Sequence, residues 1–220
     1  MNQATKTPGI SPADNPEREI VMSETQQASN WNLPNVLTTL RIIMVPLFVW
    51  LMAGGGTFGE DSLSARWWAL AVFILAMITD WLDGSIARSR NLITSFGKIA
   101  DPIADKLLTG AAFVMLSILG ELWWWVTIVI LVREWGITIM RFFVIRYGVM
   151  AAGKGGKLKT VLQTVALVLL VAPLGQLGTW ALIPGYIVMA AVVVITVVTG
   201  LDYVKKAIEL RRDYLAKNPS

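Results

Sequence analysis

Six long apolar runs, separated by shorter polar stretches, follow one another from residue 36 onward. They cover approximately 36–53, 66–82, 99–119, 123–146, 159–175 and 180–204. Each run is close to the ~20 residues that a helix needs to cross the hydrocarbon core of a bilayer. The pattern therefore predicts an all-α, polytopic membrane protein with six transmembrane helices and one domain.

The composition strengthens this prediction. Of the 220 residues, 55% are hydrophobic and only 15% are charged, whereas a soluble domain carries about a quarter charged residues. Residues 1–30 are polar and lack the apolar core of a signal peptide, so we expect a disordered tail there. The six-helix domain is expected to occupy residues 31–210, and a second polar tail residues 211–220.

Lysine and arginine are distributed unevenly between the predicted loops. The loops at 54–65, 120–122 and 176–179 contain neither residue, and Arg66 lies at a helix edge. The cations gather instead after the second and fourth runs and at the C-terminal end: Arg88, Arg90, Lys98, Arg146, Lys154, Lys157, Lys159, Lys205, Lys206, Arg211, Arg212 and Lys217. By the positive-inside rule, both termini and the loop after the second run face the cytoplasm.

Four carboxylates stand at the edges of the second and third runs. Asp80 and Asp83 are three residues apart, and Asp101 and Asp105 are four apart, so each pair shares one face of a helix. A charged residue within a membrane helix costs about 2.5–3.5 kcal/mol on insertion scales, and neighbouring like charges repel. A divalent cation would offset both costs, which predicts a polar, metal-binding active site on the cytoplasmic side.

The ligand types narrow the choice of metal and of reaction. The chain contains no His and no Cys, which leaves oxygen ligands suited to Mg²⁺ or Mn²⁺, with Ca²⁺ possible. Four carboxylates suit two ions and a phosphorylated ligand. The same absences argue against a covalent enzyme intermediate and favour direct attack by an acceptor hydroxyl that one carboxylate deprotonates. The spacing does not choose which carboxylate this is.

The acidic motif resembles the signature of a known family. Asp80-x-x-Asp83-Gly84-x-x-Ala87-Arg88 is followed, after eight residues, by Gly97-x-x-x-Asp101-x-x-x-Asp105, a pattern that resembles the signature of the CDP-alcohol phosphatidyltransferases. The resemblance implies that Asp105 is the catalytic base and that the four aspartates hold the metal ions. It also implies that a CDP-lipid contacts Gly84, Ala87, Arg88, Thr94 and Gly97. The alternatives are helix packing for Gly84 and a positive-inside role for Arg88.

A polar stripe opens the first apolar run. Asn35, Thr38 and Arg41 recur at three-residue steps, so they share a helix face. The resemblance implies that Asn35 and Thr38 contact the nucleotide of CDP-diacylglycerol. The alternative is a helix N-cap followed by an arginine that snorkels to the interface.

A second group of charges lies in the fourth and fifth runs, and it suits an acceptor that carries a phosphate. We expect the acceptor phosphate to be bound by Arg133, Arg141, Lys157, Lys159 and Gln163. The alternative for Arg133 is mutual neutralisation with Glu134.

The segments 133–135 and 156–163 resemble the bacterial phosphatidylglycerophosphate synthases of that family. This resemblance implies CDP-diacylglycerol as donor, sn-glycerol 3-phosphate as acceptor and CMP as the leaving group. It also implies a homodimer in the bacterial cytoplasmic (inner) membrane.

Two other functions stay open on the sequence. The same chemistry could use inositol phosphate, serine or phosphatidylglycerol as acceptor. Intramembrane carboxylates on facing helices are also a feature of divalent-cation transporters. That second possibility leaves the glycine and arginine positions of the motif unexplained.

Overall fold

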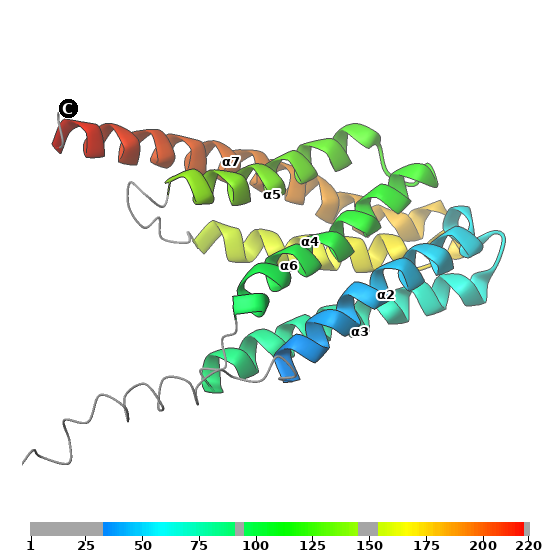
Figure 1. Ribbon diagram of the computed structural model, residues 1–220. Coiled ribbons are helices and arrows are strands. Elements are labelled where there is room, and N and C mark those ends of the chain that lie inside the picture. Colours follow the sequence, from blue (N-terminus) through cyan, green and yellow to red (C-terminus); the bar gives the residue numbers. More distant parts are fainter. Residues whose placement is uncertain (1–32, 91–94, 145–153, 218–220) are drawn as a thin grey trace, which may run out of the picture.

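The computed structural model describes residues 33–90, 95–144 and 154–217, with side chains described for 39–80, 106–140 and most of 156–216 (Figure 1). Within these ranges the regular structure is entirely helical, which confirms the predicted all-α class. The described part of the chain contains six α-helices: α2 (Leu33–Gly55), α3 (Leu63–Arg90), α4 (Ser95–Ile118), α5 (Trp124–Val144), α6 (Lys154–Val171) and α7 (Ile183–Lys217). Short 3₁₀ turns, η1, η3 and η4, lie at Thr57–Gly59, Leu174–Leu177 and Thr179–Leu182.

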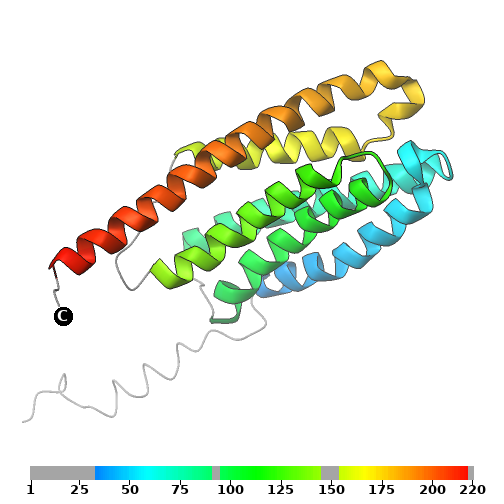
Figure 2. The same ribbon diagram turned by 90° about the horizontal axis from the view of Figure 1, so that it is seen from above.

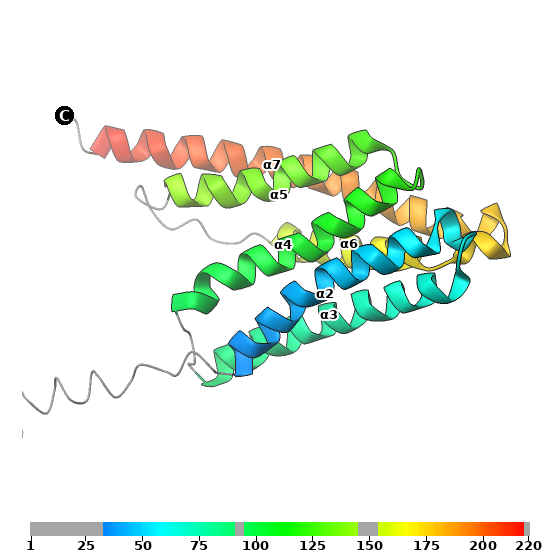
Figure 3. The same ribbon diagram turned by 45° about the vertical axis from the view of Figure 1, so that its right-hand side comes forward.

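The helices lie side by side along one long axis (Figure 2). α2 packs against α3 and α4, and α6 packs against α7, while α5 and α7 run in the same direction as neighbours (Figure 3). The short connections at 56–62, 119–123 and 172–182 gather at one end of the bundle. The C-terminal end of α3 and the N-terminal end of α4, which carry the aspartate motif, lie at the other, here called the motif end (Figure 1).

Apolar side chains fill the interior and also cover the outside. Phe48 and Phe73 are fully buried, with ring centroids 5.6 Å apart, and Phe113 is also fully buried. Large apolar side chains nevertheless face outward along the helices, among them Ile43 and Leu201, which are 60% and 66% exposed. Soluble monomers rarely expose contiguous apolar surface on this scale, so the surface suits a lipid environment.

Two described segments are long and apolar enough to cross a membrane, Leu63–Asp80 and Thr179–Arg212. Shorter apolar helical stretches are found at Thr39–Gly55, Lys106–Ile118 and Leu158–Val171. These findings support a membrane protein.

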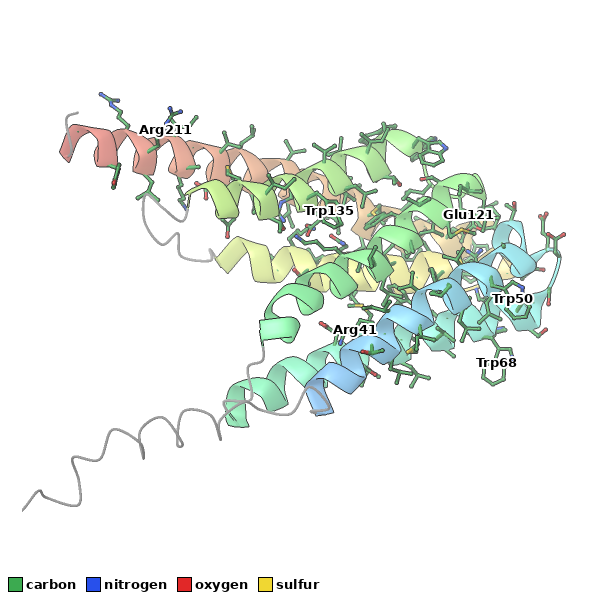
Figure 4. All side chains as sticks on the ribbon, viewed as in Figure 1. Arg41, Trp50, Trp68, Glu121, Trp135 and Arg211 are labelled. Carbon is green, nitrogen blue, oxygen red and sulfur yellow. The ribbon has the colours of Figure 1, made fainter. Side chains whose placement is uncertain are left out.

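Exposed tryptophans mark the end opposite to the motif end, here called the tryptophan end. Trp50 and Trp68, 70% and 65% exposed, lie toward this end of α2 and α3 (Figure 4). The adjoining helices and turns also carry the exposed side chains of Trp67, Trp123, Trp124, Trp125 and Trp180. Trp is enriched where membrane proteins meet the headgroup layer, so this distribution is typical of the interfacial end of a membrane protein.

A buried ion pair closes the tryptophan end. Arg66, which looks like a helix-edge residue in the sequence, is fully buried and pairs with the carboxylate of Glu121. The Arg66 guanidinium also donates to three backbone carbonyls, from Nε to Val171 at 2.8 Å, from Nη2 to Leu170 at 3.0 Å and from Nη1 to Gly56 at 3.3 Å. One side chain of α3 thereby ties together the end of α6 and the turns after α2 and α4.

Other donors complete the shell around Glu121. The backbone N–H of Phe58 donates to Glu121 Oε1 at 2.8 Å, and the Tyr186 hydroxyl donates to the Glu121 carbonyl at 2.8 Å. Phe58 has a left-handed backbone, with φ of 51°. Its ring packs against Gly175, where an added Cβ would come within 2.7 Å of the Phe58 Cβ. A glycine at position 175 therefore allows η1 and η3 to pack closely against each other.

The helix ends extend beyond the apolar runs at the motif end. α3 continues to Arg90, and α4 begins at Ser95, so both halves of the aspartate motif lie on helices. α7 continues to Lys217 as one helix of 35 residues, so residues 211–217 of the predicted polar tail are helical. The predicted N-terminal tail lies outside the described residues.

Candidate active site

The four motif aspartates lie on two helices joined by a short connection. Asp80 and Asp83 belong to the last turns of α3, and Asp101 and Asp105 belong to the first turns of α4. The predicted nucleotide contacts Gly84, Ala87 and Arg88 on α3, Gly97 on α4 and Asn35 and Thr38 on α2 lie on the same three helices. Their side chains, like those of Asp83, Asp101 and Asp105, are outside the described set, and Thr94 lies outside the described residues.

Asp80 is the motif carboxylate whose side chain is described. Arg41 of α2 pairs with it, with 2.8 Å between Arg41 Nη1 and Asp80 Oδ1. The Arg41 side chain is 1% exposed and that of Asp80 is 35% exposed. An arginine enclosed by protein does not snorkel to the interface, so that alternative is wrong for Arg41. The polar stripe on α2 thus places a cation beside the first motif carboxylate.

The metal prediction rests on the donor set. Among the described side chains, no group of three or more carboxylates could hold a metal ion. Asp80 contributes carboxylate oxygen, the ligand type that Mg²⁺ and Mn²⁺ prefer. Its exposure and its position next to the remaining motif residues fit a ligand role.

Glu134 is the centre of a second polar cluster. Its Oε1 accepts from Arg133 Nη1 at 2.9 Å and pairs with Lys159 of α6. Lys106 of α4 donates to the Glu134 backbone carbonyl at 3.1 Å, with its ammonium 5.5 Å from the ring centroid of Trp135. Cations from three helices therefore converge on one residue of α5, and the ion pair with Glu134 that was the alternative for Arg133 is present.

This cluster, here called the Glu134 cluster, extends to α7. Arg133 Nη2 donates to Thr199 Oγ1 at 3.1 Å. Among the described residues, the buried atoms Arg133 Nε, Gln163 Oε1 and Thr196 Oγ1 have no hydrogen-bond partner. Leaving such a group unpaired costs about 1–3 kcal/mol, so each of these atoms would be stabilised by a water molecule or a polar ligand.

The location of the cluster relates it to the motif end. Lys106 directly follows Asp105 on α4, so α4 carries both the last motif carboxylate and a cation of the Glu134 cluster. Lys159 is 2% exposed and Gln163 is 6% exposed, which places both predicted acceptor residues inside the protein. Arg141 and Lys157 lie on α5 and α6, with side chains outside the described set.

A comparison with known protein families identifies the family of this chain. The family model described as CDP-alcohol phosphatidyltransferase matches residues 31–199. The chain belongs to the CDP-alcohol phosphatidyltransferase family. The match includes all four motif aspartates and the Glu134 cluster.

Curated relatives in this phosphatidyltransferase family are similar over most of the chain. A probable phosphatidylglycerophosphate synthase of Mycobacterium tuberculosis (strain H37Rv) is 51% identical over 178 residues, which are 80% of this chain and 82% of the relative. The CDP-diacylglycerol–glycerol-3-phosphate 3-phosphatidyltransferase of Bacillus subtilis (strain 168) is 36% identical over 193 residues, 80% of this chain and 95% of the relative. A cardiolipin synthase (CMP-forming) of Streptomyces coelicolor is 33% identical over 145 residues, 64% of each chain.

Sequence reasoning missed three members of this phosphatidyltransferase's polar interior. Lys106 directly follows the last motif aspartate, so nothing in the sequence set it apart as a member of a second polar cluster. Thr196 and Thr199 stand three residues apart within the sixth run, a spacing that places them on one helix face. Paired hydroxyls inside an apolar run are the signal that could have found them.

Proposed function

We propose that this phosphatidyltransferase moves a phosphatidyl group from CDP-diacylglycerol to sn-glycerol 3-phosphate, giving phosphatidylglycerol phosphate and CMP. The names of the Mycobacterium and Bacillus relatives support this reaction. The structural observation that carries the acceptor assignment is the Glu134 cluster, because several cations meet there in the interior.

The acceptor phosphate binds where Arg133 and Lys159 converge. A phosphate monoester offers these cations charge-assisted hydrogen bonds, which are stronger than those between neutral groups. Arg141, Lys157 and Gln163 complete the site, and the unpaired Gln163 Oε1 accepts a hydroxyl of the acceptor. Before the acceptor arrives, Glu134 pairs with Arg133 and Lys159, and the acceptor phosphate then competes with Glu134 for both cations.

The carboxylates of α3 and α4 act on the donor. Asp80, Asp83, Asp101 and Asp105 would hold two Mg²⁺ or Mn²⁺ ions, which supply charge stabilisation to the pyrophosphate when bound. Arg41 fixes Asp80 and reduces repulsion among the four carboxylates. Asn35, Thr38, Gly84, Ala87, Arg88, Thr94 and Gly97 line the place of the CDP group.

Asp105 provides the base. Its carboxylate takes the proton of the acceptor 1-hydroxyl, the hydroxyl oxygen attacks the lipid-linked phosphorus, and CMP departs with the electrons of the broken P–O bond. With no Cys or His in the chain, a single direct displacement is the simplest route.

The six helices cross the bacterial cytoplasmic membrane, with the motif end and both termini on the cytoplasmic side. The tryptophan end supports this orientation, because its loops at 54–65, 120–122 and 176–179 carry no Lys or Arg. A homodimer is proposed from the family resemblance.

The second candidate keeps the chemistry and changes the acceptor to phosphatidylglycerol. The similarity to the Streptomyces cardiolipin synthase favours keeping this candidate. The buried cations argue for the smaller, more highly charged phosphate monoester.

An acceptor assay separates the candidates. Purified full-length protein is given CDP-diacylglycerol, Mg²⁺ or Mn²⁺, and one of glycerol 3-phosphate, inositol phosphate, serine or phosphatidylglycerol, and CMP release is followed. We expect glycerol 3-phosphate to give the highest kcat/KM, and Lys159→Gln to raise its KM more than the KM of CDP-diacylglycerol. Faster release with phosphatidylglycerol would overturn the acceptor assignment. Cation uptake into sealed vesicles without any CDP-lipid would instead support a transporter.

A further inference from the structure

A groove on the outside of the bundle lies between α5 and α7. Its cavity has a volume of about 430 Å³ and runs along α5 from Val129 to Met140 and along α7 from Thr196 to Val204. Its rim is open, because Val132 and Leu201 are each 66% exposed. Eleven residues of helix rise about 16 Å, so the groove is long and narrow.

Two glycines create its depth. A Cβ built on Gly136 meets nothing within 4 Å, and a Cβ on Gly200 would lie 3.3 Å from Arg133 Cγ. The aliphatic stem of Arg133 therefore lies against α7 at Gly200, while its guanidinium joins Glu134 and Thr199. The remaining lining is mainly Val, Ile, Leu and Met. Such a trough matches the shape and polarity of an acyl chain.

The face of α7 that lines the groove continues beyond it. Ile208 is four residues after Val204, and Arg211 is eleven residues after Gly200, close to three full helical turns. Both residues are therefore on the groove side of α7, and both are exposed. Figure 4 shows Arg211 projecting away from the bundle near the end of α7.

The neighbouring lysines have acidic partners on their own helix. Lys206 pairs with Asp202 at 2.7 Å, and Lys205 lies 4.0 Å from Glu209. By helical register, these four residues lie away from the stripe that lines the groove. Arg211 is thus the first cation along the groove face of α7, about two turns past the cavity.

We propose that the α5–α7 groove binds one phospholipid with an anionic headgroup, with an acyl chain between Gly136 and Gly200 and its phosphate on Arg211. Two features of the groove argue for this occupant. Its apolar lining suits an acyl chain, and the Arg211 guanidinium farther along the same face of α7 suits a phosphate, because guanidinium groups bind phosphate well. The groove shares Arg133 with the proposed acceptor site, but a bound phospholipid is neither the proposed donor nor the proposed acceptor, so the inference goes beyond the proposed reaction.

Lipid retention tests the proposal directly and needs no catalytic turnover. Purified full-length protein is equilibrated in mixed micelles with phosphatidylglycerol or phosphatidylcholine of the same acyl chains, and retained lipid is counted by native mass spectrometry. We expect the wild type to hold one phosphatidylglycerol per chain, with about a fivefold preference over phosphatidylcholine, as one arginine near a lipid surface provides.

Matched variants separate the two parts of the site. Gly136→Leu fills the groove and should abolish retention of either lipid, as should Val197→Phe from the opposite wall. Gly54→Leu is the control, because a Cβ on Gly54 also meets nothing within 4 Å. Arg211→Gln should keep the lipid but lose the preference for phosphatidylglycerol, whereas Lys206→Gln should keep both.

Several results would overturn the proposal. Equal retention by wild type, Gly136→Leu and Val197→Phe would show that lipid binds elsewhere, and an unchanged preference in Arg211→Gln would remove the headgroup contact. A dimer that Gly136→Leu converts to monomers, with no lipid retained by the wild type, would assign the groove to a second copy of the chain.

Discussion

Glu121 and Glu134 are both carboxylates paired with arginine inside the bundle, yet their surroundings differ. At Glu121, every polar side-chain atom of the carboxylate and of Arg66 has a protein partner, and both side chains are 0% exposed. At Glu134, the side chain is 21% exposed, and Arg133 Nε has no hydrogen-bond partner among the described residues.

The difference distinguishes an ion pair with a complete set of partners from a cluster that suits the proposed acceptor site. A buried pair whose shell is complete has no capacity left for a ligand, and breaking it leaves an uncompensated charge. In a cluster with unpaired donors and acceptors, those groups are already removed from water without a hydrogen bond in return. A polar ligand that supplies the missing hydrogen bonds offsets this cost. Charge at the tryptophan end should therefore control folding, and charge in the Glu134 cluster and at the motif end should control reaction.

Asp105→Asn should have the largest effect on activity. The substitution removes the proposed base while keeping a side chain of similar size, so we expect kcat to fall by about 10²–10⁴ with little change in thermal unfolding. CMP release and unfolding temperature are measured on the same preparation. Near-normal turnover would remove Asp105 from its role and weaken the assignment of the motif end to chemistry.

Glu121→Ala should have the largest effect on stability. It leaves the Arg66 guanidinium buried without its carboxylate, which costs about 3–5 kcal/mol in the free energy of unfolding. Denaturation in detergent measures the loss, and KM for both substrates should stay unchanged in the folded fraction. Glu121→Gln is the matched variant and should lose less, because it keeps an acceptor for the Phe58 N–H. Equal stability of all three proteins would contradict a structural role.

Glu134→Gln should have a moderate effect, and on binding. Glutamine keeps an acceptor oxygen for Arg133 but removes the charge that competes with an acceptor phosphate for Arg133 and Lys159. We expect KM for glycerol 3-phosphate to fall about fivefold, equivalent to about 1 kcal/mol, with KM for CDP-diacylglycerol unchanged. A KM that rises for both substrates equally would place Glu134 with the structural pairs instead.

The comparison also shows what the sequence could predict. Apolar runs predict the helices well, since each must bury or insert one continuous stretch, and Arg133 and Glu134 are adjacent in the chain, which suggests their pairing. Arg66 and Glu121 are 55 residues apart, and their pairing depends on which turns meet at the tryptophan end. The periodicity of apolar residues within one helix does not predict which turns of other helices lie beside it. For the same reason, the contact of Lys106 with the Glu134 carbonyl could not be derived from spacing.

Tyr186→Phe should have the smallest effect of the series. It removes one hydrogen bond, from the Tyr186 hydroxyl to the Glu121 carbonyl at 2.8 Å, while the ring contact with Trp123, at 6.2 Å between centroids, is kept. A loss of about 0.5–1.5 kcal/mol in unfolding free energy is expected, measured by the same denaturation assay. Ser64→Ala is the control, since its hydroxyl contact with Ser62 is exposed and its loss should be negligible. A change in KM for glycerol 3-phosphate in Tyr186→Phe would show that the two ends of the bundle are coupled, and the separation between a folding end and a reacting end would then fail.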